Sequence, residues 1–372
     1  MMNDMFPGRL GLQQRVVPSY RGAFFDALAQ KCKGGLSVFA GLPLADEGIE
    51  PVDRLQVARL VQAKNRYFFN PRSTMFLCWQ NGFLNWLESW QPDVLIVEAN
   101  PRYPVTRKAI SWMHGNGRKV IGWGLGAPPL SGLLSGIRGR ERLSLLHSLD
   151  AVIAYSKQGA EQYRQLGVSA GRVYVASNAV VPAPTTPPPQ KIHKSEGQAT
   201  VLFVGRLQAR KRVDLLLQAC SALAKDIHPH LVVVGDGPAQ DELKGLAQRI
   251  YPTAEFSGAK HGTELEAYFQ KADLFILPGT GGLAIQQAMA HGLPVIVAQG
   301  DGTQEDLVRG ENGWLVPPDD LQALIKVLNQ ALCDSAKLRE MGEASFRIVA
   351  NEINVVKMVE IFLQALKEIG KG

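Results

Sequence analysis

Two stretches of the sequence, residues 204–212 (VGRLQARKR) and residues 278–283 (PGTGGL), decide how the chain is interpreted. Each follows an apolar run and leads into a stretch with helical spacing, which is the pattern of a strand, a tight turn and a helix. The first stretch places basic side chains at the end of a strand. The second places a glycine-rich loop at the start of a helix. Together they describe a site for a diphosphate.

The bulk composition is that of an ordinary folded protein. The chain has 372 residues, 46% of them hydrophobic and 20% charged, so it is long enough for two domains with separate cores. It contains no apolar run of membrane-spanning length, and its first residues show no secretory signal. The four cysteines, Cys32, Cys78, Cys220 and Cys333, lack metal-ligand or disulfide spacing, which favours a reducing cytoplasm.

The positive charge is concentrated in the first half of the chain. Residues 1–180 carry 21 Lys and Arg against 12 Asp and Glu, whereas the remainder carries 19 against 22. A basic half indicates an anionic partner, such as an anionic membrane surface, a lipid-linked phosphate or nucleic acid. A basic surface that only confers solubility explains the charge equally well. No nucleic-acid-binding module is recognisable, so we expect no nucleic acid partner.

Apolar runs alternate with helical patterns along the chain, which predicts an α/β fold of parallel sheets with crossover helices. We expect two doubly wound, Rossmann-like domains that face each other across a cleft, with ligands beyond the carboxyl ends of the strands. The predicted strands that matter for the site are Leu12–Val17, Val94–Glu98, Thr200–Val204 and Leu274–Leu277.

A proline-rich segment divides the chain into its two predicted domains. Residues 181–199 include PAPTTPPP at 182–189, which can form neither a helix nor a central strand, and we interpret them as a linker. The first predicted domain covers 1–180, and the second covers 200–352. Residues 353–372 have the spacing of a C-terminal helix, for which packing back on the first domain is one option.

Arg206 and Lys211 are the predicted cations of the diphosphate site. Arg206 follows the strand Thr200–Val204, and Lys211 lies five residues further on, where the next helix begins. Two cations at this edge can hold the negative charge that builds on a departing nucleotide diphosphate. A solvated helix start rich in Arg and Lys is the alternative interpretation.

Gly281, Gly282 and Leu283 form the second half of the predicted site. The two glycines let the backbone approach a ligand closely, and the helix after Leu283 directs free N–H groups and the positive end of its dipole at the same space. A strand-to-helix turn that needs glycine only for its geometry is the alternative. The pairing with Arg206 and Lys211 at matching strand ends favours the ligand site.

The second half of the chain resembles the nucleotide-sugar-binding domain of retaining glycosyltransferases of family 4, which have the GT-B architecture. The first half is similar more loosely, and the resemblance spans nearly the full length. It implies that Arg206 and Lys211 bind the diphosphate and that the region Gly281–Leu283 lies near phosphate and sugar. The matching pieces are 204–207 (VGRL) with Lys211, 234–238 (VGDGP), 256–258 (FSG), 272–278 (ADLFILP), 288–290 (AMA), Gly292 with 294–296 (PVI), 311–316 (ENGWLV), 150–157 (DAVIAYSK) and Asn178.

The sequence departs from the family at two positions. The family carries two glutamates eight positions apart around the loop, and here the aligned residues are Gly279 and Gln287. Gln287 can still hydrogen-bond ribose hydroxyls, whereas Gly279 offers only backbone to the donor sugar. Either the donor sugar is bound differently, which we favour, or transfer activity has been lost. Glu305 is a nearby carboxylate that could compensate, or an ordinary carboxylate at a helix start.

The resemblance implies that the first domain binds the acceptor, and two of its residues are candidate substrate contacts. Glu98 ends the strand Val94–Glu98, where relatives often place a histidine near the sugar, so it is a candidate catalytic contact to donor or acceptor. A strand-end carboxylate paired with Arg102 is the alternative. Gly22 lies after the first strand, where relatives bring a loop glycine close to the donor phosphates, although a structural turn explains it as simply. The basic and apolar segment Leu133–Leu149 is compatible with a membrane surface, a lipid-linked acceptor or an ordinary core helix.

The resemblance implies a metal-independent glycosyltransferase that moves a sugar from a nucleotide-diphosphate donor to a glycan or lipid-linked acceptor. We expect no metal ion and no cofactor, and a cytoplasmic location that includes the inner face of the membrane. Surface polysaccharide biosynthesis is the expected setting. A nucleotide-sugar epimerase on the same fold and a non-catalytic nucleotide-sugar-binding protein remain alternatives, and the residues at Gly279 and Gln287 support the second of these.

Overall fold

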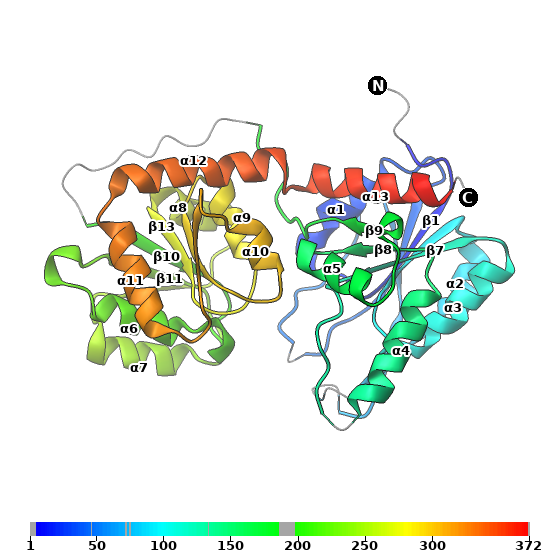
Figure 1. Cartoon of the computed structure of the whole chain (residues 1–372), viewed down its shortest axis with the longest axis horizontal. Helices are drawn as coiled ribbons and strands as arrows, with labels where there is room; N and C mark the ends of the chain where they lie inside the picture. Colours follow the sequence, from blue (N-terminus) through cyan, green and yellow to red (C-terminus); the bar gives the residue numbers. More distant parts are fainter. Residues whose placement is uncertain are drawn as a thin grey trace. The chain divides into compact units, whose positions relative to one another are not determined.

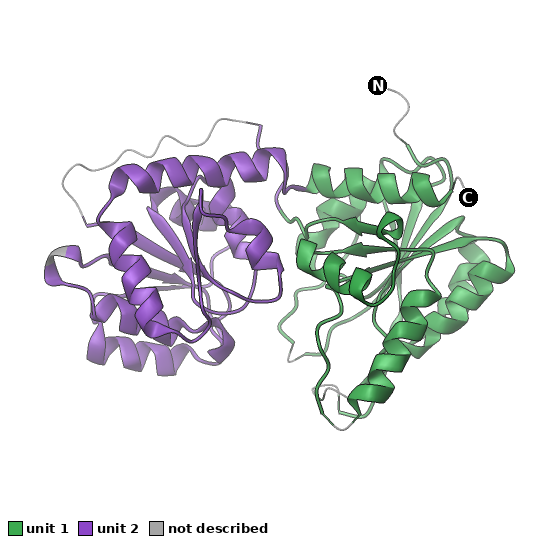
Figure 2. Ribbon diagram, viewed as in Figure 1, with its two compact units in different colours: residues 1–180, 355–372 green, residues 181–354 purple. Residues whose placement is uncertain are grey.

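The structure, a computed structural model, describes residues 5–370 apart from residues 46, 71, 72, 74, 75, 133 and 186–197. The chain forms two compact units, shown in different colours in Figure 2. The first unit combines residues 1–180 with residues 355–372, and the second contains residues 181–354. The chain therefore leaves the first unit, builds the second, and returns to the first.

In the described part of the first unit, seven parallel strands form the sheet in the order β3-β2-β1-β6-β7-β8-β9. The strand order reverses direction between β1 and β6, which are hydrogen-bonded neighbours in the middle of the sheet. The strands are β1 (Leu10–Val16), β2 (Leu36–Gly41), β3 (Arg59–Gln62), β6 (Val94–Glu98), β7 (Lys119–Gly124), β8 (Ala151–Ala154) and β9 (Val173–Val175), and a separate antiparallel pair is β4 (Lys64–Phe68) with β5 (Leu77–Asn81).

Helices cover both faces of this sheet (Figure 1). One face packs against α1 and α13, and the opposite face packs against the other four helices. The central strands are almost entirely apolar because both of their faces are buried, with Leu95 and Ile96 serving opposite cores. The helices are α1 (Gly22–Ala29), α2 (Phe83–Trp90), α3 (Pro104–Gly115), α4 (Ser135–His147), α5 (Lys157–Gln165) and α13 (Val355–Ile369).

The returning helix α13 completes the core of the first unit. Its Phe362 is fully buried, and its ring centroid lies 4.9 Å from that of Phe24 on α1 and 5.1 Å from that of Trp123 on β7. Such aromatic clusters combine a large buried area with favourable edge-to-face geometry. Residues from the two ends of the described chain thus share one core.

The second unit has the strand order of a doubly wound nucleotide-binding sheet. Among its described residues, six parallel strands are arranged β12-β11-β10-β13-β14-β15, so that the order reverses between β10 and β13. Thr200–Val204 and Leu274–Leu277, as predicted from sequence, are the two strands at this point of reversal. The strands are β10 (Thr200–Val204), β11 (His230–Val234), β12 (Glu255–Gly258), β13 (Leu274–Leu277), β14 (Val295–Ala298) and β15 (Gly313–Val316).

The helices of the second unit connect these strands in the right order for a doubly wound fold. Helix α6 packs against α7 and α11, and α9 packs against α12. The helices are α6 (Val213–Ser221), α7 (Gln240–Ile250), α8 (Gly262–Lys271), α9 (Leu283–Ala290), α10 (Thr303–Leu307), α11 (Leu321–Leu332) and α12 (Ser335–Asn351). The predicted α/β fold with two doubly wound domains is confirmed.

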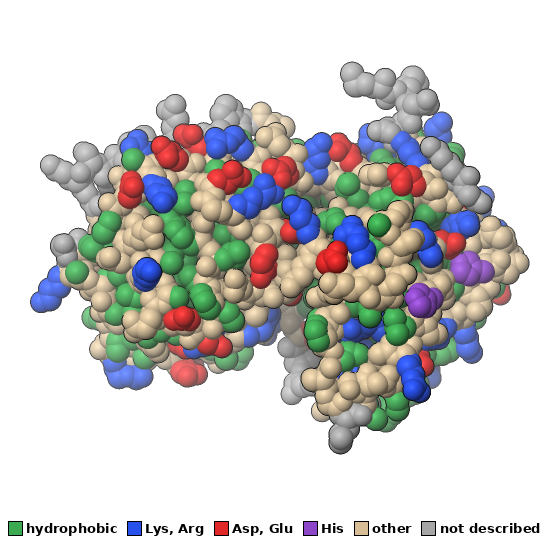
Figure 3. Space-filling view, viewed as in Figure 1, with side chains coloured by type: hydrophobic (Ala, Val, Ile, Leu, Met, Phe, Trp, Pro, Cys, Tyr) green, Lys and Arg blue, Asp and Glu red, His purple; other side chains and the backbone are tan. Residues whose placement is uncertain are grey.

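The remaining sequence predictions for the fold concern the proline-rich segment, membrane-spanning helices and the distribution of charge. Of the proline-rich segment 181–199, residues 186–197 lie outside the described residues, and residues 181–185 contain neither helix nor strand. In the described segments, no helix is long and apolar enough to cross a membrane. Figure 3 shows basic and acidic side chains interspersed on one face of each unit.

The role of α13 can be tested with a cavity mutation. We expect Phe362→Ala to destabilise the first unit by about 3–5 kcal/mol, because it removes a buried aromatic ring from the cluster with Phe24 and Trp123. Urea unfolding measures the change. Val356→Ala on the same helix is the control, since Val356 is 50% exposed and its loss should have little effect. Equal stabilities of the two variants would contradict this role.

Candidate functional site

The candidate site of the second unit lies where the strand order reverses, at the carboxyl ends of β10 and β13. These strands are paired in parallel, with Val201 opposite Leu274 and Leu202 opposite Phe275. Because parallel neighbours end at the same edge, the segment after β10 and the loop after β13 emerge side by side. In sheets of this type ligands bind in the crevice at such a point of reversal.

A backbone contact holds these two segments together. The Thr280 N–H donates to the carbonyl of Arg210 at 3.0 Å, and the Arg210 Nη1 donates to Thr280 Oγ1 at 3.2 Å. Gly279 lies directly against the same turn, since a Cβ atom at this position would be 2.2 Å from the Arg210 carbonyl oxygen. Only glycine fits there without displacing backbone. The structure therefore gives a packing reason for the glycine at position 279.

The Lys211 ammonium lies against the glycine loop. A Cβ atom built on Gly281 would be 2.2 Å from Lys211 Nζ, and Gly281 has φ of +137°, a conformation that favours glycine. Gly282 and Leu283 follow at once as the N-cap and first residue of α9. The structure thus brings together Lys211 and the loop, two parts of the site that were predicted separately. A cation and the free N–H groups of a helix start there face one region.

The environment of Lys211 lowers the pKa of its ammonium group. Burial, with a smaller contribution from the positive charge of Arg210, lowers the pKa of Lys211 to about 8. Among the described residues the ammonium makes no hydrogen bond or ion pair. Desolvated cations without a partner gain most from an incoming anion.

The glycine loop is also held from its other side, by α10. The buried side chain of Gln304 donates from Nε2 to the carbonyl of Gly281 at 3.0 Å. Glu305 accepts from the Gly300 N–H at 3.1 Å through Oε1, while its Oε2 is buried without a hydrogen-bond partner in the described residues. Gln304 was not predicted, because no local pattern distinguishes it from an ordinary helix residue.

Arg206 and Gln287 are the other predicted polar residues of this unit. Arg206 is half-buried in the segment that joins β10 to the turn of Arg210 and Lys211, and its guanidinium makes no hydrogen bond or ion pair with the described residues. Gln287 is partly exposed on α9, one turn beyond Leu283, and its side-chain amide is likewise without a partner in the described segments. Both side chains are available to a ligand.

The first unit carries a polar cluster where its own strand order reverses. Glu98, the last residue of β6, accepts from the backbone N–H of Arg15 on β1 at 2.6 Å and from the hydroxyl of Tyr103. Burial raises the pKa of the Glu98 carboxyl, although these two donors oppose the shift. Arg102, its alternative partner, instead stacks its guanidinium 4.9 Å from the ring centroid of Phe76. Pairing of Glu98 with Arg102 was therefore the wrong alternative.

Gly22 begins α1 in ordinary helical geometry and packs against Val52, so its backbone needs no glycine-specific conformation. Its neighbour Arg21 is the more unusual residue, and sequence reasoning missed it. The Arg21 guanidinium is buried 4.4 Å from the ring centroid of Trp123, and its Nη1 has no hydrogen-bond partner in the described residues. The stacking of a buried cation on a tryptophan is a tertiary contact, which residue spacing in the sequence cannot predict.

The contact between Gly279 and the Arg210 carbonyl predicts that a side chain at position 279 lowers the stability of the second unit. We expect Gly279→Ala to destabilise the second unit by about 1–3 kcal/mol, because the new methyl group meets backbone that cannot rotate away. Thermal unfolding measures the loss. Gly310→Ala is the matched control, since a Cβ atom there meets nothing within 4 Å. If Gly279→Ala unfolded at the wild-type temperature, the close packing of the two loops would be refuted.

Comparison with known proteins places this geometry in context. Residues 186–347 match the family "Glycosyl transferases group 1". An exopolysaccharide phosphotransferase of Streptomyces coelicolor is 30% identical over 246 residues, which are 62% of this chain and 25% of that protein. A GDP-mannose-dependent alpha-mannosyltransferase of Corynebacterium glutamicum is 34% identical over 161 residues, which are 42% of this chain and 37% of that protein. The chain thus matches well under half the length of these relatives.

A solved structure extends the likeness to the whole chain. Anabaena HepE in complex with UDP has a TM-score of 0.70 at 18% identity, covering 97% of this chain and 99% of that chain. At this identity the likeness concerns the fold. The chain therefore has the GT-B fold, and residues 186–347, which include most of its second unit, are similar to the glycosyl transferases group 1.

Proposed function

We propose that this protein is a retaining glycosyltransferase that moves a sugar from a nucleotide diphosphate to a hydroxyl of a glycan or lipid-linked acceptor in polysaccharide biosynthesis. The observation that carries the proposal is the Lys211 ammonium, which lies against Gly281 near the start of α9 and has no hydrogen bond or ion pair with the described residues. An anion in that region meets a cation and the leading amides of a helix together.

The proposed chemistry depends on stabilising the leaving group. As the bond from the sugar to the diphosphate breaks, negative charge builds on the phosphate oxygens, and Arg206, Lys211 and backbone N–H groups after Gly281 would bind it. These positive groups would supply charge stabilisation without a metal ion. The acceptor hydroxyl would attack the same face of the sugar from which the diphosphate leaves, and its proton would pass to a phosphate oxygen, so that the configuration is retained.

The remaining predicted residues have proposed roles around the donor. Gln287 would hydrogen-bond the ribose hydroxyls in place of the family's second glutamate. Gly282 and Leu283 would offer backbone N–H groups, and Gly279 would leave the donor sugar to be bound by other groups. From the first unit, Glu98 would contact donor or acceptor, and Gly22 would lie close to the donor phosphates.

The relatives support a nucleotide-sugar donor but leave its base open. The name of the mannosyltransferase of Corynebacterium glutamicum specifies GDP-mannose, whereas the HepE structure contains UDP. The exopolysaccharide phosphotransferase is consistent with a polysaccharide setting. A thermal-shift screen with UDP, GDP, ADP and their sugar conjugates would identify the donor, because a ligand that binds only the folded protein raises its melting temperature.

The site assignment predicts a separation of activity from stability. We expect Arg206→Ala and Lys211→Ala each to reduce sugar transfer by about a hundredfold or more, as the loss of a transition-state charge contact does, with little change in melting temperature. Transfer from the donor found in the screen measures this. Arg249→Ala, an exposed change on α7, is the control. Wild-type turnover in both site variants would remove the assignment, and binding without any transfer would favour a non-catalytic role.

The lowered pKa of Lys211 predicts a pH dependence of binding. Above pH 8 the free protein loses the Lys211 proton and with it one attraction for the diphosphate. The dissociation constant for the bound nucleotide should therefore rise by up to about tenfold between about pH 7 and about pH 9. Lys211→Arg keeps its charge across this range and should abolish the dependence. A pH-independent wild type, measured by calorimetry, would contradict the proposed contact.

A further inference from the structure

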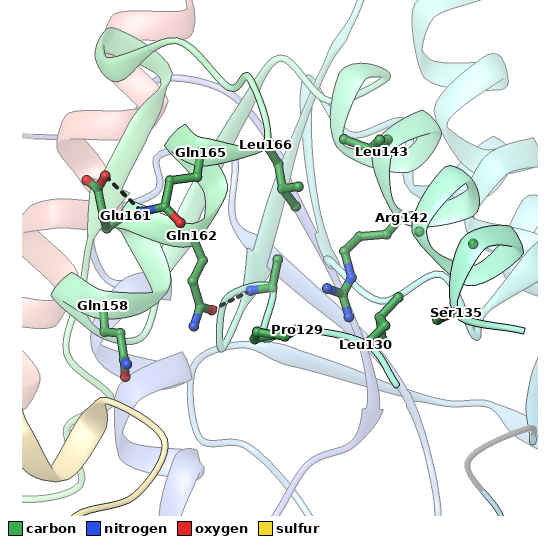
Figure 4. Close-up of a pocket in the computed structure, with 13 residues that line it drawn as sticks. Pro129, Leu130, Ser135, Arg142, Leu143, Gln158, Glu161, Gln162, Gln165 and Leu166 are labelled. Atoms are coloured by element: carbon green, nitrogen blue, oxygen red, sulfur yellow. Dashed lines mark hydrogen bonds between the residues drawn. The ribbon is translucent and has the colours of Figure 1, made fainter. Parts of the chain in front are cut away.

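A pocket of about 720 Å³ lies within the first unit, between α4 and α5 (Figure 4). Its size is that of a typical site for a small molecule. The loop that follows β7, including Ala127, Pro129 and Leu130, closes one side. No predicted donor-site residue lines it, so this pocket is separate from the site of the second unit.

The wall contributed by α5 is a stripe of polar side chains. Gln158, Glu161, Gln162 and Gln165 all line the pocket, and their spacing of three, four and seven residues places them on one face of the helix. Gln165 donates to Glu161 at 3.4 Å, but the described residues offer no hydrogen bond to Gln158 or to the Nε2 of Gln162. Planar amide and carboxylate groups in a row suit a ligand that presents several hydroxyls.

The wall contributed by α4 includes two glycines at positions where larger side chains would narrow the pocket. Gly136 and Gly139 line the pocket, and a Cβ atom at either position would meet nothing within 4 Å. Each glycine inside a helix costs about 1 kcal/mol relative to alanine. Neither position needs glycine for close packing, and together the two leave room beside Leu143 for another molecule.

Arg142 gives the pocket a cation without a carboxylate partner. Its side chain extends from α4 into the space between the helices (Figure 4), and its Nη1 donates to the Pro128 carbonyl at 2.7 Å. Within the described segments it forms no ion pair, while Glu161 pairs with Arg164 at 3.5 Å. Burial and the nearby charge of Arg138 lower the pKa of Arg142. A partly desolvated cation of this kind favours an anionic ligand group.

The floor of the pocket is fixed before any ligand arrives. Gly126 and Gly159 are in close contact, since a Cβ atom on Gly126 would be 2.6 Å from the Gly159 Cα. The Gly126 N–H donates to the Tyr163 hydroxyl at 3.1 Å, and the Ala127 N–H donates to Gln162 Oε1 at 2.8 Å. A preformed site loses less free energy on binding than one that must order its loops.

We propose that the pocket between α4 and α5 binds an acidic sugar residue of the acceptor glycan. The amide stripe of α5 binds its hydroxyls, Leu130 and Leu143 pack on its apolar ring face, and Arg142 pairs with its carboxylate or phosphate. That this sugar belongs to an acceptor rests on the proposed transferase function, whereas the binding of an acidic sugar to the pocket does not. A hydrocarbon chain fits less well, because it would cover the polar stripe of α5 and the half-buried guanidinium without giving them hydrogen-bond partners.

Calorimetry on the full chain tests this with three probes: trigalacturonate, glucose 1-phosphate and neutral maltotriose. We expect at least one acidic probe to bind about tenfold more tightly than maltotriose, as a charge-assisted contact implies. Gly139→Trp, which fills the pocket, should abolish binding of that probe. Arg142→Gln should weaken it about tenfold while leaving maltotriose unchanged. Gly115→Trp is the matched control, because it adds the same side chain at the end of α3, where a Cβ atom also meets nothing within 4 Å.

Each outcome decides the proposal. Binding of trigalacturonate alone would identify the anion as a carboxylate, and binding of glucose 1-phosphate alone as a phosphate. The proposal is overturned if neither acidic probe binds, if maltotriose binds as tightly, or if the folded Gly139→Trp protein binds like the wild type. Should Gly139→Trp fail to fold, Arg142→Gln decides alone. The shift of the melting temperature on adding nucleotide tests the site of the second unit separately. If no nucleotide binds but an acidic sugar does, the proposed transferase function is refuted and the proposed sugar site is not.

Discussion

The second unit is organised by the contact of Gly279 with the carbonyl of Arg210. Because a glycine fits against backbone where no side chain can, the loop after β13 and the turn after β10 approach each other directly. That approach places Lys211 against Gly281, and Gln304 secures the same loop from α10. Adjacent parallel strands at a reversal of strand order make such an arrangement possible. A larger residue at position 279, such as glutamate, would separate the two segments, so the glycine is part of this geometry.

How far the sequence predicts the fold depends on burial. Strands Thr200–Val204 and Leu274–Leu277 were predicted to the residue, because parallel strands buried on both faces are continuous apolar runs. Strand β3 and the pair β4–β5 were missed, because β3 and β4 are exposed or half-buried throughout and all three strands carry polar side chains. Short strands of that kind resemble loops until their partners are known.

The candidate site shows the same division. Arg206, Lys211 and the glycine loop could be predicted, because they follow strands and belong to a recognisable pattern. The hydrogen bond from Gln304 to Gly281 and the stacking of Arg21 on Trp123 could not be predicted, because both are contacts between segments far apart in sequence. The α4–α5 pocket was not predicted either, because its walls come from helices that are separate in sequence. For the segment Leu133–Leu149, of which Leu133 lies outside the described residues, the sequence indicated only a membrane surface, a lipid-linked acceptor or a core helix.

The return of the chain into the first unit constrains how this protein can be made. Phe362 lies in the same core as Phe24 and Trp123, yet it is synthesised after the whole second unit. A ribosome therefore releases the early strands and helices of the first unit with an unfilled hydrophobic groove, which stays open while some 170 further residues emerge. Until α13 docks, that groove is the natural target for a chaperone, and a chain cut short before residue 355 would keep it permanently exposed.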